Sequence, residues 1–139
     1  MPNELNANAQ KWVDALRSGK YTQTRGALRS DEGNNPKFCC LGVACDLYAK
    51  ETSMDGWWRK SKNGEFPLYK FVSGCSSSED ALPILVAEWL GLKTVEGAFI
   101  PDHTGLRLGS LIALNDDLRL DFAQIADIIE SQPEGLFNA

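Results

Sequence analysis

The stretch from Lys37 to Tyr48 constrains the fold most strongly, because a short extended segment there turns into a helix. From Cys40 onward, apolar side chains recur at helical spacing, at Cys40, Val43, Ala44, Leu47 and Tyr48. Residues with this spacing share the helix face that packs against a core. The pattern therefore predicts that Cys40 is buried and unreactive.

The composition predicts one domain with an ordinary hydrophobic core. The chain has 139 residues, of which 43% are hydrophobic. That is enough apolar surface for a domain to fold without disulfide bonds. Met1 to Glu4 lack the start of a secretory signal, and no stretch approaches the ~18 apolar residues that span a bilayer. We predict a single domain over residues 1–139, located in the cytoplasm, with reduced cysteines.

Three further helices are predicted from caps and apolar spacing. Asn8 is the expected cap of a helix that runs to Ser18. A second helix has Pro83 in its first turn, carries Leu85, Val86, Trp89 and Leu90, and closes at Gly91. The last begins at Asp121, which forms a capping box with Gln124.

Two hairpins are predicted between these helices. Residues 27–29 and 37–39 flank a turn-rich segment, and residues 57–60 and 66–72 flank Asn63-Gly64, a strong hairpin signal. Residues 97–100 form a weak further strand. Together the elements predict an α+β fold, with about four helices packed against short antiparallel hairpins.

The charge of the chain argues against non-specific binding of nucleic acids. The formal net charge is −5, so the chain as a whole is repelled by phosphate backbones, and non-specific nucleic-acid binding is not expected. A local basic cluster runs from Lys11 to Arg29. It could meet an anion, although such a cluster is more often a solvated surface.

Several segments form a pattern that covers most of the chain: Phe38-Cys39-Cys40-Leu41-Gly42-Val43-x-Cys45-Asp46-Leu47, Leu114-Asn115-Asp116, and Phe122-x-x-Ile125-Ala126-Asp127-x-Ile129-Glu130. This pattern resembles a group of short uncharacterised proteins from tailed phages and bacteria. The resemblance implies a phage accessory protein that acts in the host cytoplasm, and it implies no catalytic residue.

The aromatic residues of the second hairpin are the main candidates for binding. Trp57, Trp58 and Tyr69 lie close in sequence to Arg59, and Arg25 and Arg29 add positive charge. Aromatic rings beside arginines suit a host protein or a small, anionic, nucleotide-like ligand. The alternative is that these rings belong to the core. If the hairpin binds a partner, at least one of the two tryptophans should be exposed.

A cysteine hydrolase is the alternative function. A cysteine at the start of a helix, followed later by a histidine on a strand, is similar to papain-like hydrolases of the cell-wall-peptidase kind. The candidates are Cys39, or less well Cys40, with His103. A helix amino terminus lowers a thiol pKa, and a nearby imidazole completes its activation.

Metal and cofactor sites are not expected. Cys40 and Cys45 point about 140° apart on a helix and cannot share one ion. Cys39, Cys75 and His103 could meet only through the fold. The sequence therefore favours a non-enzymatic binding protein that uses no metal or cofactor.

Overall fold

The computed structural model describes residues 5–25, 27–32, 35–52, 56–59, 68–73, 76–78, 81–100 and 109–138. Its helices are α1 (Ala7–Arg17), α2 (Cys40–Thr52), α3 (Ile84–Leu90), α4 (Leu111–Asp116) and α5 (Phe122–Glu130). Its strands are β1 (Thr22–Gln23), β2 (Arg29–Glu32), β3 (Asn35–Phe38), β4 (Gly56–Arg59), β5 (Leu68–Ser73) and β6 (Ser76–Ser78). The predicted turn at Asn63-Gly64, and the residues Cys75 and His103, lie outside the described ranges.

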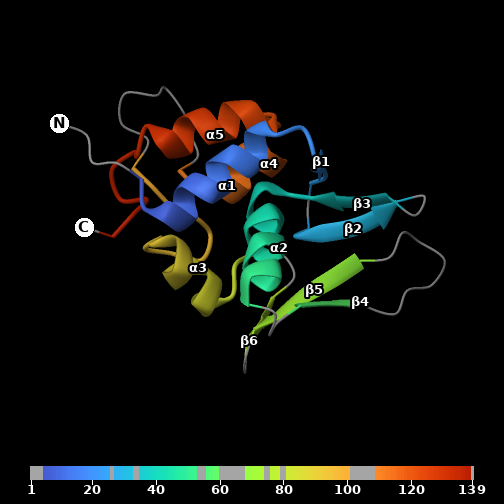
Figure 1. Cartoon of the computed structure of the whole chain (residues 1–139). Helices are drawn as coiled ribbons and strands as arrows, with labels where there is room; N and C mark the ends of the chain where they lie inside the picture. Colours follow the sequence, from blue (N-terminus) through green and yellow to red (C-terminus); the bar gives the residue numbers. More distant parts are fainter. Residues whose placement is uncertain are drawn as a thin grey trace.

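The helices gather at one side of the molecule and the sheet lies at the other, with α2 between them (Figure 1). The strand order is β1-β3-β2-β5-β4, and β6 also pairs with β5. Strands β1 and β3 run parallel, and the other neighbouring strands of the described residues are antiparallel. This arrangement confirms the predicted α+β class.

Both predicted hairpins are confirmed at the level of strand pairing, since β2 pairs with β3 and β4 pairs with β5. The sequence did not predict that they join. Arg29 of β2 lies opposite Tyr69 of β5, so the two hairpins form one sheet.

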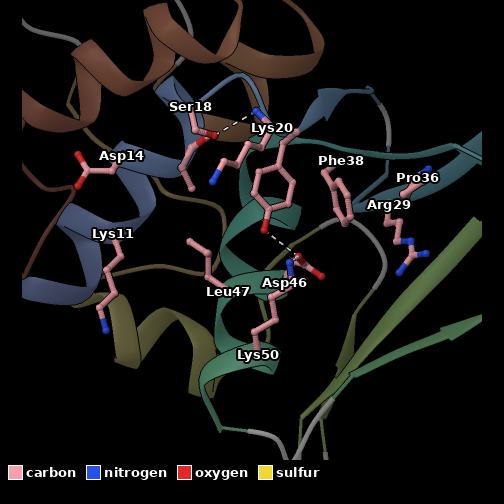
Figure 2. Close-up of a pocket in the computed structure, with 12 residues that line it drawn as sticks. Lys11, Asp14, Ser18, Lys20, Arg29, Pro36, Phe38, Asp46, Leu47 and Lys50 are labelled. Carbon is pink, nitrogen blue, oxygen red and sulfur yellow. Dashed lines mark hydrogen bonds and ion pairs between the residues drawn. The ribbon is translucent and has the colours of Figure 1, made fainter.

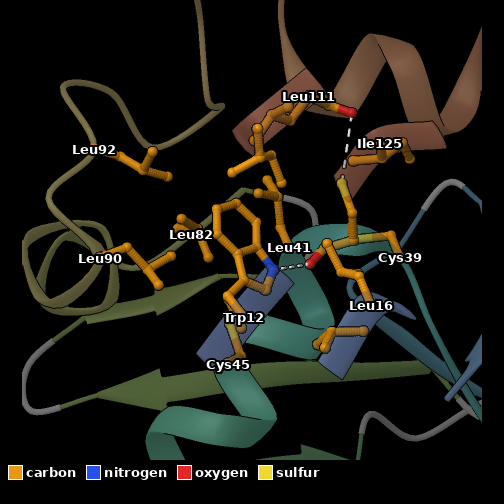
Figure 3. Packing of buried hydrophobic residues seen from close by; sticks show 14 of the residues in the cluster. Trp12, Leu16, Cys39, Leu41, Cys45, Leu82, Leu90, Leu92, Leu111 and Ile125 are labelled. Carbon is orange, nitrogen blue, oxygen red and sulfur yellow. Dashed lines mark hydrogen bonds between the residues drawn. The ribbon is translucent and has the colours of Figure 1, made fainter. Parts of the chain in front are cut away.

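The amino-terminal half of α2 is the centre of the core (Figure 3). Every residue from Cys40 to Cys45 is buried, so the predicted burial of Cys40 is confirmed, and its low reactivity stays a prediction. A single apolar stripe was too narrow a description of this helix. A helix that is buried all round has neighbours on every side. One of them is α1, whose Trp12 is fully buried and donates from Nε1 to the carbonyl oxygen of Cys40 over 2.9 Å.

Two predicted helix starts are wrong by one or two residues. Asn6, not Asn8, caps α1 and accepts a hydrogen bond from the amide of Ala9 at 2.9 Å. The Asn8 side chain instead donates to the carbonyl oxygen of Trp89 at 3.0 Å. Pro83 is the N-cap of α3 rather than part of its first turn. A helix cap is recognised from the local sequence, but tertiary contacts decide which of two nearby asparagines caps the helix.

The capping box of the last helix is confirmed, with both reciprocal hydrogen bonds between Asp121 and Gln124. Other details differ from expectation. Residues 97–100 form no strand and make one isolated bridge, between Ala98 and Ser110. Leu85, one of the apolar residues from which α3 was predicted, is 44% exposed. The described part of the chain contains α4 as a fifth helix, which is only six residues long.

None of the helices within the described ranges has the length and apolar character that crossing a bilayer requires.

Candidate functional site

An open pocket of ≈ 680 Å³ lies between α1, α2 and the β1–β3 end of the sheet (Figure 2). It is lined by Lys11, Asp14, Ala15, Ser18, Lys20, Tyr21, Arg29, Pro36, Phe38, Asp46, Leu47 and Lys50. These residues come from four separate stretches of the chain, so the pocket exists only in the folded chain.

The pocket is locally basic although the chain is acidic. It collects four of the chain's fourteen Lys and Arg residues and only two acidic ones. Lys11 is paired with Glu51 at 2.7 Å, and Lys50 is paired with Asp46 at 3.0 Å. Lys20 is exposed and forms no ion pair with any residue that the structure describes. An anion entering this pocket would therefore meet uncompensated positive charge.

Asp46 joins three neighbours at one wall of the pocket. Its Oδ2 accepts from the hydroxyl of Tyr21 at 2.7 Å and pairs with the ammonium of Lys50. Its Oδ1 accepts from Nε1 of Trp57 at 3.2 Å. The side chain of Asp46 is only 14% exposed. Burial, followed by the hydrogen bond to Asp46, raises the pKa of Tyr21, so the tyrosine stays protonated and keeps this arrangement.

The rings of Tyr21, Phe38 and Trp57 form a row of contacts beside Asp46. Tyr21 meets Phe38 edge-on with ring centroids 5.2 Å apart, and Phe38 meets Trp57 at 5.7 Å. The guanidinium carbon of Arg29 lies 5.6 Å from the Phe38 ring centroid and 5.5 Å from that of Trp57. Both distances are in the range of cation–π contacts.

The structure brings together most of the residues predicted to bind a partner. Trp57 contacts Arg29, and the strand register places Tyr69 opposite both Arg29 and Arg59. Trp58 lies opposite Lys70 in the same pairing, and nothing further is described of its side chain. Trp57 is half-buried, so whether either tryptophan is substantially exposed remains a prediction.

Other parts of the predicted basic cluster serve different contacts. Arg25 is apart from the pocket and donates from Nε to the backbone oxygen of Asn115 at 3.0 Å. Arg17 pairs with Asp127 at 2.7 Å and with Glu130 at 3.0 Å, which ties α1 to α5. Hydrogen bonds to Glu130 and Asp127 raise the pKa of Arg17. These two arginines hold the helices and loops in place.

The alternative nucleophile, Cys39, has a structural role. It precedes α2, and its Sγ accepts a hydrogen bond from the amide of Gly42 at 3.4 Å, as an N-cap does. It is 5% exposed, and burial raises its pKa to about 12. A thiol with this pKa carries almost no thiolate at neutral pH, which disfavours the hydrolase. His103 lies outside the described residues, so the pairing itself stays a prediction.

The three described cysteines should therefore react slowly with thiol reagents in the native protein. Burial also raises the pKa of Cys40 and of Cys45. Native labelling with iodoacetamide, read by peptide mass spectrometry, should leave Cys39, Cys40 and Cys45 unmodified over a period in which the urea-unfolded protein is fully labelled. Rapid native labelling of Cys39 would restore the case for a catalytic thiol.

A buried asparagine holds the start of α2 in place, and the sequence reading did not assign it this role. Asn115 is fully buried in α4, and its Oδ1 accepts from the amide of Cys40 at 3.2 Å and from the Gln23 side chain at 2.8 Å. Its Nδ2 donates to the backbone oxygen of Thr24 at 2.9 Å. Asn115 therefore links β1, which directly follows the pocket residue Tyr21, to the start of α2.

Several pocket residues were also missed by sequence reasoning. Asp46 and Lys50 stand four residues apart, which is a visible helix ion-pair spacing. Nothing in the sequence connects them to Lys20 and Tyr21. Among the described residues, no three His, Cys, Asp or Glu side chains gather as metal ligands would.

A family model for a domain of unknown function, DUF8296, matches residues 5–133. The chain belongs to the DUF8296 family. The DUF8296 match spans α1 to α5 and includes every residue that lines the pocket. No curated protein and no solved structure matches the chain.

Proposed function

We propose that this protein binds a small anionic ligand that carries a planar ring, of nucleotide-like kind, in the pocket between α1 and α2, and that it does so without catalysis. The observation that carries the proposal is the meeting of Lys20 and Arg29 with the rings of Tyr21 and Phe38 in one concave site. Cations attract the charged part of such a ligand, and apolar and aromatic walls accept its ring.

The biological setting belongs to the same proposal. The motif pattern around Cys39 and Asn115 suits a phage or prophage accessory protein that acts in the cytoplasm of the bacterial host. A host protein is the second candidate partner, through the strand β4 that carries Trp57, Trp58 and Arg59. The pocket is the better-supported site, because its side chains and its concave shape are both described.

Titration with ADP tests the proposal. Isothermal titration calorimetry of the wild-type protein should show binding of ADP, and inorganic pyrophosphate should bind more weakly because it lacks a ring. Lys20→Ala should weaken ADP binding about tenfold, equal to roughly 1.4 kcal/mol, because a charge-assisted contact is lost.

Lys93→Ala is the matched control, since Lys93 is also exposed and does not line the pocket. It removes the same charge from the protein and should leave ADP affinity unchanged. The proposal fails if ADP does not bind at millimolar concentration, or if the two lysine variants lose affinity equally.

A further inference from the structure

The carboxylate of Asp46 has room for one more hydrogen bond. A carboxylate accepts about four hydrogen bonds through its two oxygens. Tyr21 and Lys50 approach Oδ2 at 2.7 Å and 3.0 Å, and Nε1 of Trp57 donates to Oδ1 at 3.2 Å. No other residue that the structure describes donates to this side chain. Because Asp46 lines the pocket, Oδ1 can accept the further hydrogen bond from a compound bound there.

The hydroxyl oxygen of Tyr21 is a second acceptor at the same wall of the pocket. The hydroxyl has one proton, and it donates that proton to the bond with Asp46. Its oxygen can therefore only accept from a ligand. An amino group on a ring carries two N–H donors and suits two neighbouring acceptors. A carbonyl oxygen or a C–H group in the same place would leave both acceptors unpaired.

Lys50 does not reverse this preference, although it is a donor beside the same carboxylate. Its ammonium pairs with Asp46 and lies 5.7 Å from the centroid of the Tyr21 ring. The Lys50 side chain is largely exposed, so water satisfies its remaining N–H donors. A ligand carbonyl that bonded to Lys50 would only replace that water, which gives little net affinity.

Asp14, the other acidic residue of the pocket, is a poorer acceptor site. It is exposed, and its Oδ1 accepts from Nε2 of Gln10 at 3.0 Å. A hydrogen bond to a solvated carboxylate mostly replaces a bond to water. Asp46 is largely buried and is already held by three donors, so a ligand that bonds to it has little side-chain entropy to remove.

The negative charge of Asp46 and the positive charge of Lys20 mark different points of the pocket. Figure 2 shows Lys20 beside Ser18, where α1 ends, and Asp46 with Leu47 and Lys50 on α2. A compound with an anionic group at one end and an amino-bearing ring at the other matches both charges.

We infer that Asp46, together with the hydroxyl oxygen of Tyr21, selects ligands whose ring carries an amino group, as the aminopurine of ADP does. This inference rests on the proposed function and narrows its ligand class by the ring rather than by the anion. Asp46 is then a specificity-determining residue, because it disfavours rings that offer it no donor.

The test compares ADP with purine riboside diphosphate, which has a hydrogen atom in place of the amino group. The phosphates are the same, so the ratio of the two dissociation constants, measured by isothermal titration calorimetry, reports the amino group. The wild-type protein should bind ADP about tenfold more tightly, as expected for a hydrogen bond to a charged acceptor. In Asp46→Asn the preference should fall to about threefold or less, because a neutral acceptor is roughly half as strong.

The ratio separates recognition of the ring from the general effect of charge. Asp46→Asn removes a negative charge from the pocket, which should strengthen the binding of both diphosphates. Asp14→Asn is the matched control, since it makes the same chemical change in the same pocket and should leave the ratio at its wild-type value. A ratio lost in Asp14→Asn but kept in Asp46→Asn would assign the amino group to Asp14 and overturn this inference.

The wild-type complex gives a second measurement should Asp46→Asn fail to fold. The amino protons of bound ADP should show a nuclear Overhauser effect to the ring protons of Tyr21, because the tyrosine hydroxyl lies beside Asp46. Contacts from Tyr21 to the ribose protons alone would contradict the inferred orientation.

The proposed function and this inference fail in different ways. If neither diphosphate binds the wild-type protein, the proposed function falls and this inference falls with it. If both bind equally well, or if Asp46→Asn keeps the full preference for ADP, the pocket still binds anionic ring compounds and this inference alone is overturned.

Discussion

Replacing Gly42 by alanine should destabilise the protein by at least about 3 kcal/mol, near the upper end of overpacking costs. Gly42 lies on the face of α2 that meets the backbone of Leu28, where an added Cβ would overlap the carbonyl oxygen and lie 2.8 Å from the carbonyl carbon. A backbone cannot move aside as a flexible side chain can. Urea unfolding followed by circular dichroism measures the change.

The sign of this effect is informative, because helix propensity alone predicts the opposite. Alanine is about 1 kcal/mol better than glycine inside a helix. Gly19→Ala is a useful comparison: nothing lies within 4 Å of its added Cβ, but φ is +78°. It should cost about 1 kcal/mol through backbone strain alone. A Gly42→Ala protein as stable as the wild type would mean that α2 does not pack this closely against Leu28.

Replacing Trp12 by alanine should cost about 3–5 kcal/mol, as expected when a large buried ring leaves a cavity. Trp12 is fully buried and is also the donor to the Cys40 carbonyl oxygen at 2.9 Å. Trp12→Phe keeps most of the apolar volume and loses the donor, so it should cost about 1–3 kcal/mol. Thermal and urea unfolding give both values.

Trp89 is the control for this prediction. It is half-buried at the edge of the core, and it packs edge-on against Tyr48 at 5.6 Å. Trp89→Ala should therefore be less destabilising than Trp12→Ala. The reverse order would contradict the central position assigned to Trp12.

Features specified by adjacent residues could be predicted from the sequence. The Asp121 capping box, the helix end at Gly91 and both strand pairings depend on residues that are close along the chain, and each is present. The short helix α4 could not be predicted, because six residues make too few turns to show periodicity.

The pocket could be predicted only in part. Arg29 was identified from local charge and Trp57 from aromatic density, but their meeting with Tyr21 and Asp46 is tertiary. It depends on the parallel pairing of β1 with β3 and on the packing of α1 against α2. Neither the strand pairing nor the helix packing produces a recognisable pattern in a single sequence. Candidate residues could therefore be predicted, but the cavity that they line could not.

Helix α2 has two halves with different surroundings. The first half ends at Cys45, which is fully buried, and the second begins at Asp46, which lines the pocket. Segments at the centre of a core open only when the whole domain unfolds. A compound bound beside Asp46 therefore resists global unfolding rather than a local fluctuation, and it adds RT ln(1 + [L]/Kd) to the stability. The melting temperature of the protein should therefore rise with any compound that binds the native state, which allows unknown ligands to be sought without any assay of activity.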